Sequence, residues 1–76
     1  MNTRTTLTAT FRALDTEGKE YLVEEYTVYT EVFSRNKTYW ETLDKLYFTD
    51  SAMARYNEKD NTFTVYDSRH VLKRVG

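Results

Sequence analysis

The sequence predicts a small all-β domain, an antiparallel meander of about six strands, curled or barrel-like, that forms a single domain over residues 1–76. Short runs of alternating apolar and polar residues, separated by turn-forming residues, are typical of strands with one buried face. Seven tyrosines, four phenylalanines and one tryptophan favour strands further, since aromatic side chains pack well on a pleated surface. The chain has no proline and two glycines, so it does not resemble a linker.

A long N-terminal hairpin is the clearest element. Residues 3–14 alternate apolar and polar, a turn with Gly18 follows, and residues 21–33 form the returning strand. A type I turn with Gly18 in the left-handed region sets the register. The expected pairs are Asp15 with Lys19, Ala13 with Tyr21 and Phe11 with Val23.

That register places Glu25 on the apolar face, opposite Ala9. One extra residue at Glu24–Glu25 returns apolar residues to the apolar face, because Ala9 then faces Tyr26 and Leu7 faces Val28. A β-bulge inserts a residue in this way and bends the strand. We therefore expect a bulge at Glu24–Glu25, and a bent strand that serves two sheets of a barrel-like domain.

The stretch from Thr38 to Tyr47 permits two interpretations. Thr38 to Glu41 matches a helix capping box, and Trp40, Leu43 and Tyr47 recur at helical spacing. Residues 46–49 are strand-like instead. We expect a loop or a single helical turn near Trp40 followed by a strand over 43–49. The alternative is an α+β fold with one short helix at about 38–47.

The last third of the chain predicts three short strands, at 52–56, 62–66 and 71–75. Turns are expected at Asp50–Ser51, at 57–61, where Asn61 tolerates left-handed geometry, and at 67–70. The predicted core consists of Leu7, Ala9, Phe11, Val23, Tyr26, Val28, Phe48, Met53, Phe63, Val65, Val71 and Val75.

Signals of catalysis or of a cofactor are absent from the sequence. There is no cysteine, His70 is the single histidine, and no glycine-rich phosphate loop occurs. We therefore expect no enzyme activity, no cofactor and no metal. No apolar run is long enough to span a membrane, and the first residues lack a signal-peptide pattern, so a cytoplasmic protein is expected.

Aromatic side chains exceed what a core of this size needs, which predicts a binding module that contacts a protein partner or a second copy. Exposed tyrosine and tryptophan supply large contact areas at low entropic cost. A net charge of −1 opposes self-association little. The candidate contact residues are Tyr29, Tyr39, Trp40 and Tyr66.

Single-stranded nucleic-acid binding is the alternative. Basic side chains near Tyr56 and Tyr66 can hold phosphates while the aromatic rings stack on bases. The candidate residues are Arg55, Arg69, Lys73 and Arg74. The near-balance of 11 basic and 12 acidic residues weighs against it, because nucleic-acid binders are usually basic.

Overall fold

The computed structural model describes residues 2–76, and these form six antiparallel strands that close into a barrel in sequential order. The strands are β1 (Thr3–Leu14), β2 (Glu20–Ser34), β3 (Lys37–Thr49), β4 (Ala52–Asn57), β5 (Thr62–Val65) and β6 (Val71–Arg74). The all-β, barrel-like meander predicted from the sequence is therefore confirmed.

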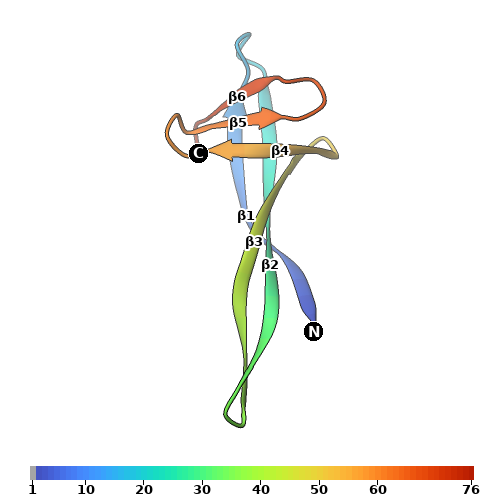
Figure 1. Cartoon of the computed structure of the whole chain (residues 1–76). Coiled ribbons are helices and arrows are strands. Elements are labelled where there is room, and N and C mark those ends of the chain that lie inside the picture. The colour runs from blue at the N-terminus through green and yellow to red at the C-terminus, as the bar shows by residue number, and fades with distance from the viewer. Residues whose placement is uncertain (1) are drawn as a thin grey trace.

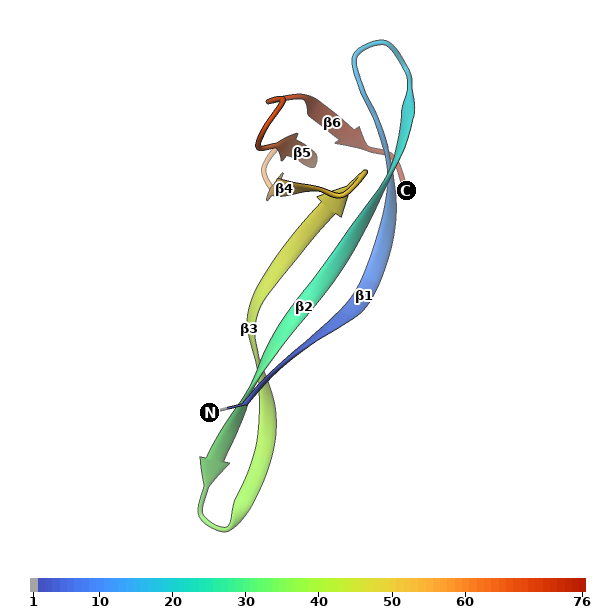
Figure 2. The same cartoon turned by 90° about the vertical axis from the view of Figure 1, so that its right-hand side faces the viewer.

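The barrel occupies only one end of an elongated molecule that measures 54 × 21 × 18 Å. The three short strands β4, β5 and β6 cross over one end of β1 and β2, and the remaining length of β1, β2 and β3 extends beyond them (Figure 1). Figure 2 shows β4, β5 and β6 on one side of the β1–β2 pair. We call residues 9–27 and 45–76 the barrel, and the extension formed by residues 3–7, 28–34 and 37–44 the arm.

The N-terminal hairpin has the predicted register near its turn. Ala13 pairs with Tyr21 and Phe11 with Val23, while Gly18 has a φ of 84°. The hairpin is bulged, as expected, but the predicted position at Glu24–Glu25 is wrong. The register shifts between Leu7 and Ala9, so the extra residue lies in β1 and is Thr8.

The bulge lies in β1 because Glu25 stays on the inner face of the barrel. Glu25 pairs with Ala9, and its side chain is buried. A buried carboxylate is tolerated when hydrogen-bond donors surround it. Thr8 and Tyr47 supply hydroxyl donors here. Beyond the bulge Leu7 faces Tyr26, rather than Val28 as predicted.

The predicted loop or helical turn near Trp40, and the alternative helix at 38–47, are both wrong. Residues Lys37–Thr49 form one continuous strand that pairs with β2 along almost its whole length. A two-residue turn at Arg35–Asn36, with φ values of 45° and 67°, connects the two strands. Ladder pairing with β2 satisfies the backbone groups on one edge of this strand, so the helical spacing of Trp40, Leu43 and Tyr47 has no structural consequence.

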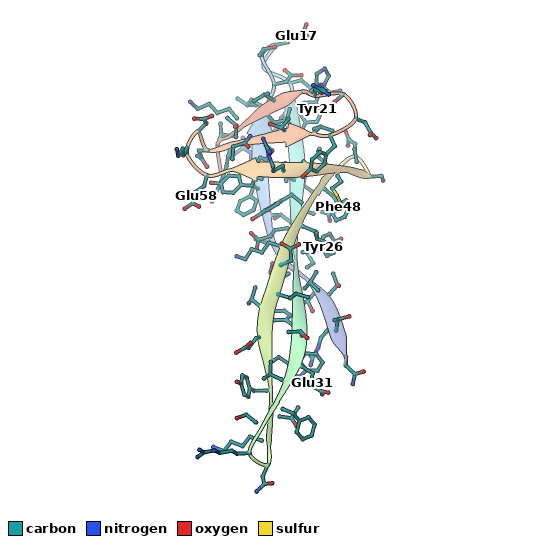
Figure 3. All side chains as sticks on the ribbon, viewed as in Figure 1. Glu17, Tyr21, Tyr26, Glu31, Phe48 and Glu58 are labelled. Atoms are coloured by element: carbon teal, nitrogen blue, oxygen red, sulfur yellow. The ribbon has the colours of Figure 1, made fainter. Side chains whose placement is uncertain are left out.

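The core lies inside the barrel and is smaller than predicted. Its buried apolar residues are Ala13, Val23, Ala54, Phe63, Val65 and Leu72, with Phe11, Tyr21, Tyr47, Ala52 and Tyr56 packed against them. Of the predicted core, Leu7, Met53, Val71 and Val75 are exposed instead. Tyr26 and Phe48 lie outside it as well, in an edge-to-face pair with ring centroids 5.7 Å apart (Figure 3).

Candidate interaction surface

One face of the sheet runs without interruption from the barrel interior onto the arm. On β2 this face carries alternate residues, from Val23 in the core through Glu25 and Thr27 to Tyr29 in the arm. Strands β4 to β6 cover only the first part of the face. Glu31, which Figure 3 labels far along the arm, belongs to the uncovered part.

A polar cluster marks the point where the barrel ends and the arm begins. Glu25 is 8% exposed and accepts hydrogen bonds from the hydroxyl of Thr8 at 2.7 Å and from that of Tyr47 at 3.1 Å. The Thr8 hydroxyl also lies 2.8 Å from that of Thr27, and the Lys45 ammonium lies 3.8 Å from the Glu25 carboxylate. The cluster therefore satisfies the charge of Glu25 in an otherwise apolar interior.

The same cluster changes the acidity of Tyr47. Burial of the phenol, together with its hydrogen bond to Glu25 and the charge of that carboxylate, raises the pKa of Tyr47 to about 12. The hydroxyl therefore stays protonated at neutral pH and serves as a donor. The sequence analysis missed this cluster. Its one signal was that Glu25 falls on the apolar face of the predicted hairpin, and this was interpreted as a bulge instead of as a buried acid.

A cavity of about 320 Å³ opens at this end of the barrel. Aromatic rings and four charged side chains surround it, among them Arg74, whose guanidinium lies 4.1 Å from the centroid of the Phe11 ring. The lining residues are Phe11, Glu25, Lys45, Tyr47, Tyr56, Glu58, Phe63 and Arg74. Its two acidic and two basic groups balance in formal charge, so the lining favours neither anions nor cations by charge alone.

Farther along the same face, the arm presents an aromatic surface that we define by Arg4, Tyr29, Phe33 and Trp40. The Arg4 guanidinium lies 4.2 Å from the centroid of the Trp40 ring, a cation–π contact across three strands. Arg4, Tyr29 and Trp40, with Thr6, line a shallow hollow of about 290 Å³. The structure thus brings Tyr29 and Trp40 together, as two of the four predicted contact residues.

The far end of the arm has the least internal support. Strand β1 pairs with β2 as far as Thr30, and the Glu31 N–H donates to the Asn2 carbonyl, so the segment beyond Glu31 is a two-stranded ribbon. Phe33 in this ribbon is 78% exposed. Sequence reasoning did not select Phe33, although it lies two residues from Glu31 on the face that carries Tyr29 and Trp40.

The other two predicted contact residues lie elsewhere. Tyr39 is exposed but pairs with Val32 on the opposite face of the arm. Tyr66 follows β5 on the barrel, and its side chain is 54% exposed. The four candidates therefore divide between two faces of the arm and the barrel, and they do not make one surface.

The four basic residues of the nucleic-acid alternative are also dispersed. Arg55 on β4 pairs with Thr64, and Lys73 on β6 pairs with Thr62, so both lie on the outer face of these strands. Arg69 occupies the β5–β6 turn with a φ of 60°. Arg74 faces the other way, against the ring of Phe11.

Comparison with known proteins finds no match for this chain among family models, curated proteins or solved structures. Residues 2–76 contain no helix that is long and apolar enough to cross a membrane. The same residues place no group of three or more histidine, aspartate and glutamate side chains where they could hold a metal ion.

Proposed function

We propose that this protein is a non-catalytic protein-interaction module whose contact surface is the arm. The observation that carries the proposal is the aromatic surface of Arg4, Tyr29, Phe33 and Trp40, which lies on the face that the barrel strands leave uncovered. Aromatic and arginine side chains are the residues most enriched at the centres of protein interfaces.

The architecture of the arm supports the same conclusion. An isolated two-stranded ribbon is marginally stable in water, and exposed strand edges readily pair with other chains. The arm ends in such a ribbon, and β3 has an open edge along it. A protein partner that covers this region gains apolar contact area and backbone hydrogen bonds together.

Photo-crosslinking in cells tests the proposal directly. Phe33 is replaced by a photoreactive phenylalanine analogue, and the matched control carries the analogue at Leu22, which is 57% exposed on the outer face of the barrel. We expect protein adducts at position 33 and none at position 22. Adducts at position 22 alone, or no protein adduct at position 33, would contradict the proposal.

Single-stranded nucleic-acid binding through Arg55, Arg69, Lys73 and Arg74 ranks second, because the structure distributes these side chains over two faces and a turn. Binding through them would weaken steeply with salt. Recovery of crosslinked nucleic acid rather than protein from either position would favour this alternative over the interaction module.

A further inference from the structure

We propose that the partner of the arm is a second copy of this chain, with β3 of each copy paired antiparallel about a two-fold axis at Tyr39. The inference rests on the proposed function, because it identifies the partner of that surface. A two-fold axis brings the same strand edge from both copies together, so the edge must complement itself.

The open edge of β3 has the length and regularity that such pairing requires. Strand β4 begins to pair with β3 only at Tyr47, and no described residue pairs with the outer side of residues 37–46. The register with β2 is regular from Lys37 to Thr42, and a shift follows between Thr42 and Asp44. This regular stretch contains neither proline nor glycine, two residues that block or weaken edge pairing.

The other open edge of the arm, on β1, is less suited to pairing. Its regular stretch in the arm is limited to residues 3–7, because the bulge at Thr8 interrupts it. Bulges of this kind protect edges against pairing with other chains. The β1 stretch also contains no aromatic side chain, whereas β3 contributes Tyr39 and Trp40.

Backbone geometry determines which residues of β3 direct their N–H and C=O groups away from β2. The turn at Arg35–Asn36 closes on the pair Ser34–Lys37, and the hydrogen-bonded pairs of an antiparallel ladder then alternate along the strand. This alternation turns the backbone groups of Thr38, Trp40 and Thr42 away from β2. An axis at Tyr39 places Thr38 opposite Trp40 of the second copy, so these outward groups face one another.

Charge distinguishes this register from its neighbours. With the axis at Tyr39, Lys37 lies directly opposite Glu41 of the second copy, and Tyr39 lies opposite its copy. An axis at Glu41 would place Glu41 opposite Glu41 and Lys37 opposite Lys45, and an axis at Trp40 would place Lys37 opposite Leu43. Like charges in opposite positions destabilise a sheet, whereas opposite charges and aromatic pairs stabilise it. The side chains of β3 are therefore complementary about Tyr39.

The resulting dimer joins the two aromatic surfaces into one. Trp40 of each copy lies opposite Thr38 and diagonal to Trp40 of the other, each with Arg4 of its own chain stacked on the outer side. The barrels lie at opposite ends and do not meet. Because pairing involves only a short strand from each copy, the interface is small, and such interfaces are usually weak, with dissociation constants of about 1 to 100 μM.

Sedimentation equilibrium with an edge-blocking variant tests the dimer. Thr38→Pro removes an outward N–H and leaves the pairing with β2 intact, because proline is tolerated on an edge whose N–H faces solvent. The matched control is Thr5→Pro on the edge of β1. We expect reversible dimerisation of the wild type and of Thr5→Pro, and a dimer dissociation constant at least about tenfold higher for Thr38→Pro.

A charge exchange provides a second measurement that does not depend on proline. Glu41→Lys places like charges on Lys37 and residue 41 of the two copies, and we expect dimerisation about two- to fivefold weaker. The double variant Lys37→Glu with Glu41→Lys restores opposite charges and recovers the lost affinity. Equal affinities for the single and double variants would overturn the proposed register.

The mass of the adduct crosslinked at position 33 separates this inference from the proposed function. An adduct of twice the chain mass, with a wild type that dimerises in solution, supports both. A wild type that remains monomeric at about 1 mM while position 33 crosslinks to a different protein overturns the dimer and leaves the interaction module standing. A monomer without any protein adduct overturns both.

Discussion

The barrel and the arm are built from the same three long strands, yet they differ in what covers them. In the barrel, the inner face of β2 lies beneath β4, β5 and β6, and the rings of Phe11, Tyr47 and Tyr56 pack around Phe63 with centroids 4.9 to 5.9 Å away. In the arm, the same face of β2 carries Tyr29 and Phe33 without a covering layer (Figure 1).

Strand length explains the difference. Strands β1, β2 and β3 have 12, 15 and 13 residues, whereas β4, β5 and β6 have six, four and four. At about 3.3 Å per residue, β2 spans nearly the whole 54 Å of the molecule. The short strands can close a barrel only at one end. The candidate binding surface is therefore the continuation of the core face beyond the strands that cover it.

The largest expected difference between the two regions is in the cost of removing a phenylalanine ring. Phe63 is fully buried, so Phe63→Ala should lower the free energy of unfolding by about 3–5 kcal/mol, enough to unfold much of a domain this small. Phe33→Ala on the exposed arm should change it by less than about 0.5 kcal/mol. Urea denaturation followed by circular dichroism measures both.

Conditions that keep the protein monomeric are needed for this comparison, because a partner on the arm would add stability through Phe33. Low protein concentration provides them. If the two variants were equally destabilised, Phe33 would belong to a packed core, and the distinction between barrel and arm would fail.

Local sequence patterns were sufficient for every strand except the first half of β3, for most turns and for one end of the first hairpin. Alternation identified β1 and β2, and Gly18 fixed the pairing of Phe11 with Val23. Asn61 has the expected positive φ, 56°. These features depend on residues that are close in sequence. The class of fold followed from them, because five short meander connections leave few arrangements.

The features that were missed depend on partners distant in sequence. The inward position of Glu25 requires Thr8, 17 residues away, and Tyr47, 22 residues away. Neither partner is visible from the pattern around Glu25. The buried face of β6 was predicted wrongly for another reason. Val71 and Leu72 are both apolar, so alternation alone does not decide which of them points inward, and in the structure Leu72 is the buried one. For the site, Tyr29 and Trp40 were predicted, but their proximity depended on the register of three strands.

A smaller effect is expected at the boundary between barrel and arm. Tyr47→Phe removes the hydroxyl that donates to Glu25 and should cost about 1 kcal/mol, since the tyrosine is only partly buried. The raised pKa of Tyr47 adds a pH dependence. Its contribution is complete below the unfolded value of 10 and is lost as the pH rises toward about 12.

Urea denaturation of the wild type and of Tyr47→Phe between about pH 8 and pH 12 tests this dependence, because that range brackets the ordinary pKa of tyrosine, about 10. The stability difference between the two proteins should shrink across the upper half of that range. A difference that stays constant with pH would show that the Tyr47 hydroxyl does not stabilise the boundary through Glu25.

The smallest expected effect compares two turns of the same type, one in each region. Asp50–Ser51 joins β3 to β4 in the barrel with φ values of 48° and 65°, close to those of Arg35–Asn36 at the end of the arm. Glycine adopts such values without steric cost. Ser51→Gly should therefore raise the free energy of unfolding by up to about 1 kcal/mol, or the Tm by about 4–8 °C.

Asn36→Gly should leave the Tm nearly unchanged, because asparagine already tolerates this geometry and the end of the arm opens before the barrel unfolds. Differential scanning calorimetry of the two variants tests whether the two regions unfold separately. Equal increases in Tm would mean that arm and barrel unfold as one cooperative unit.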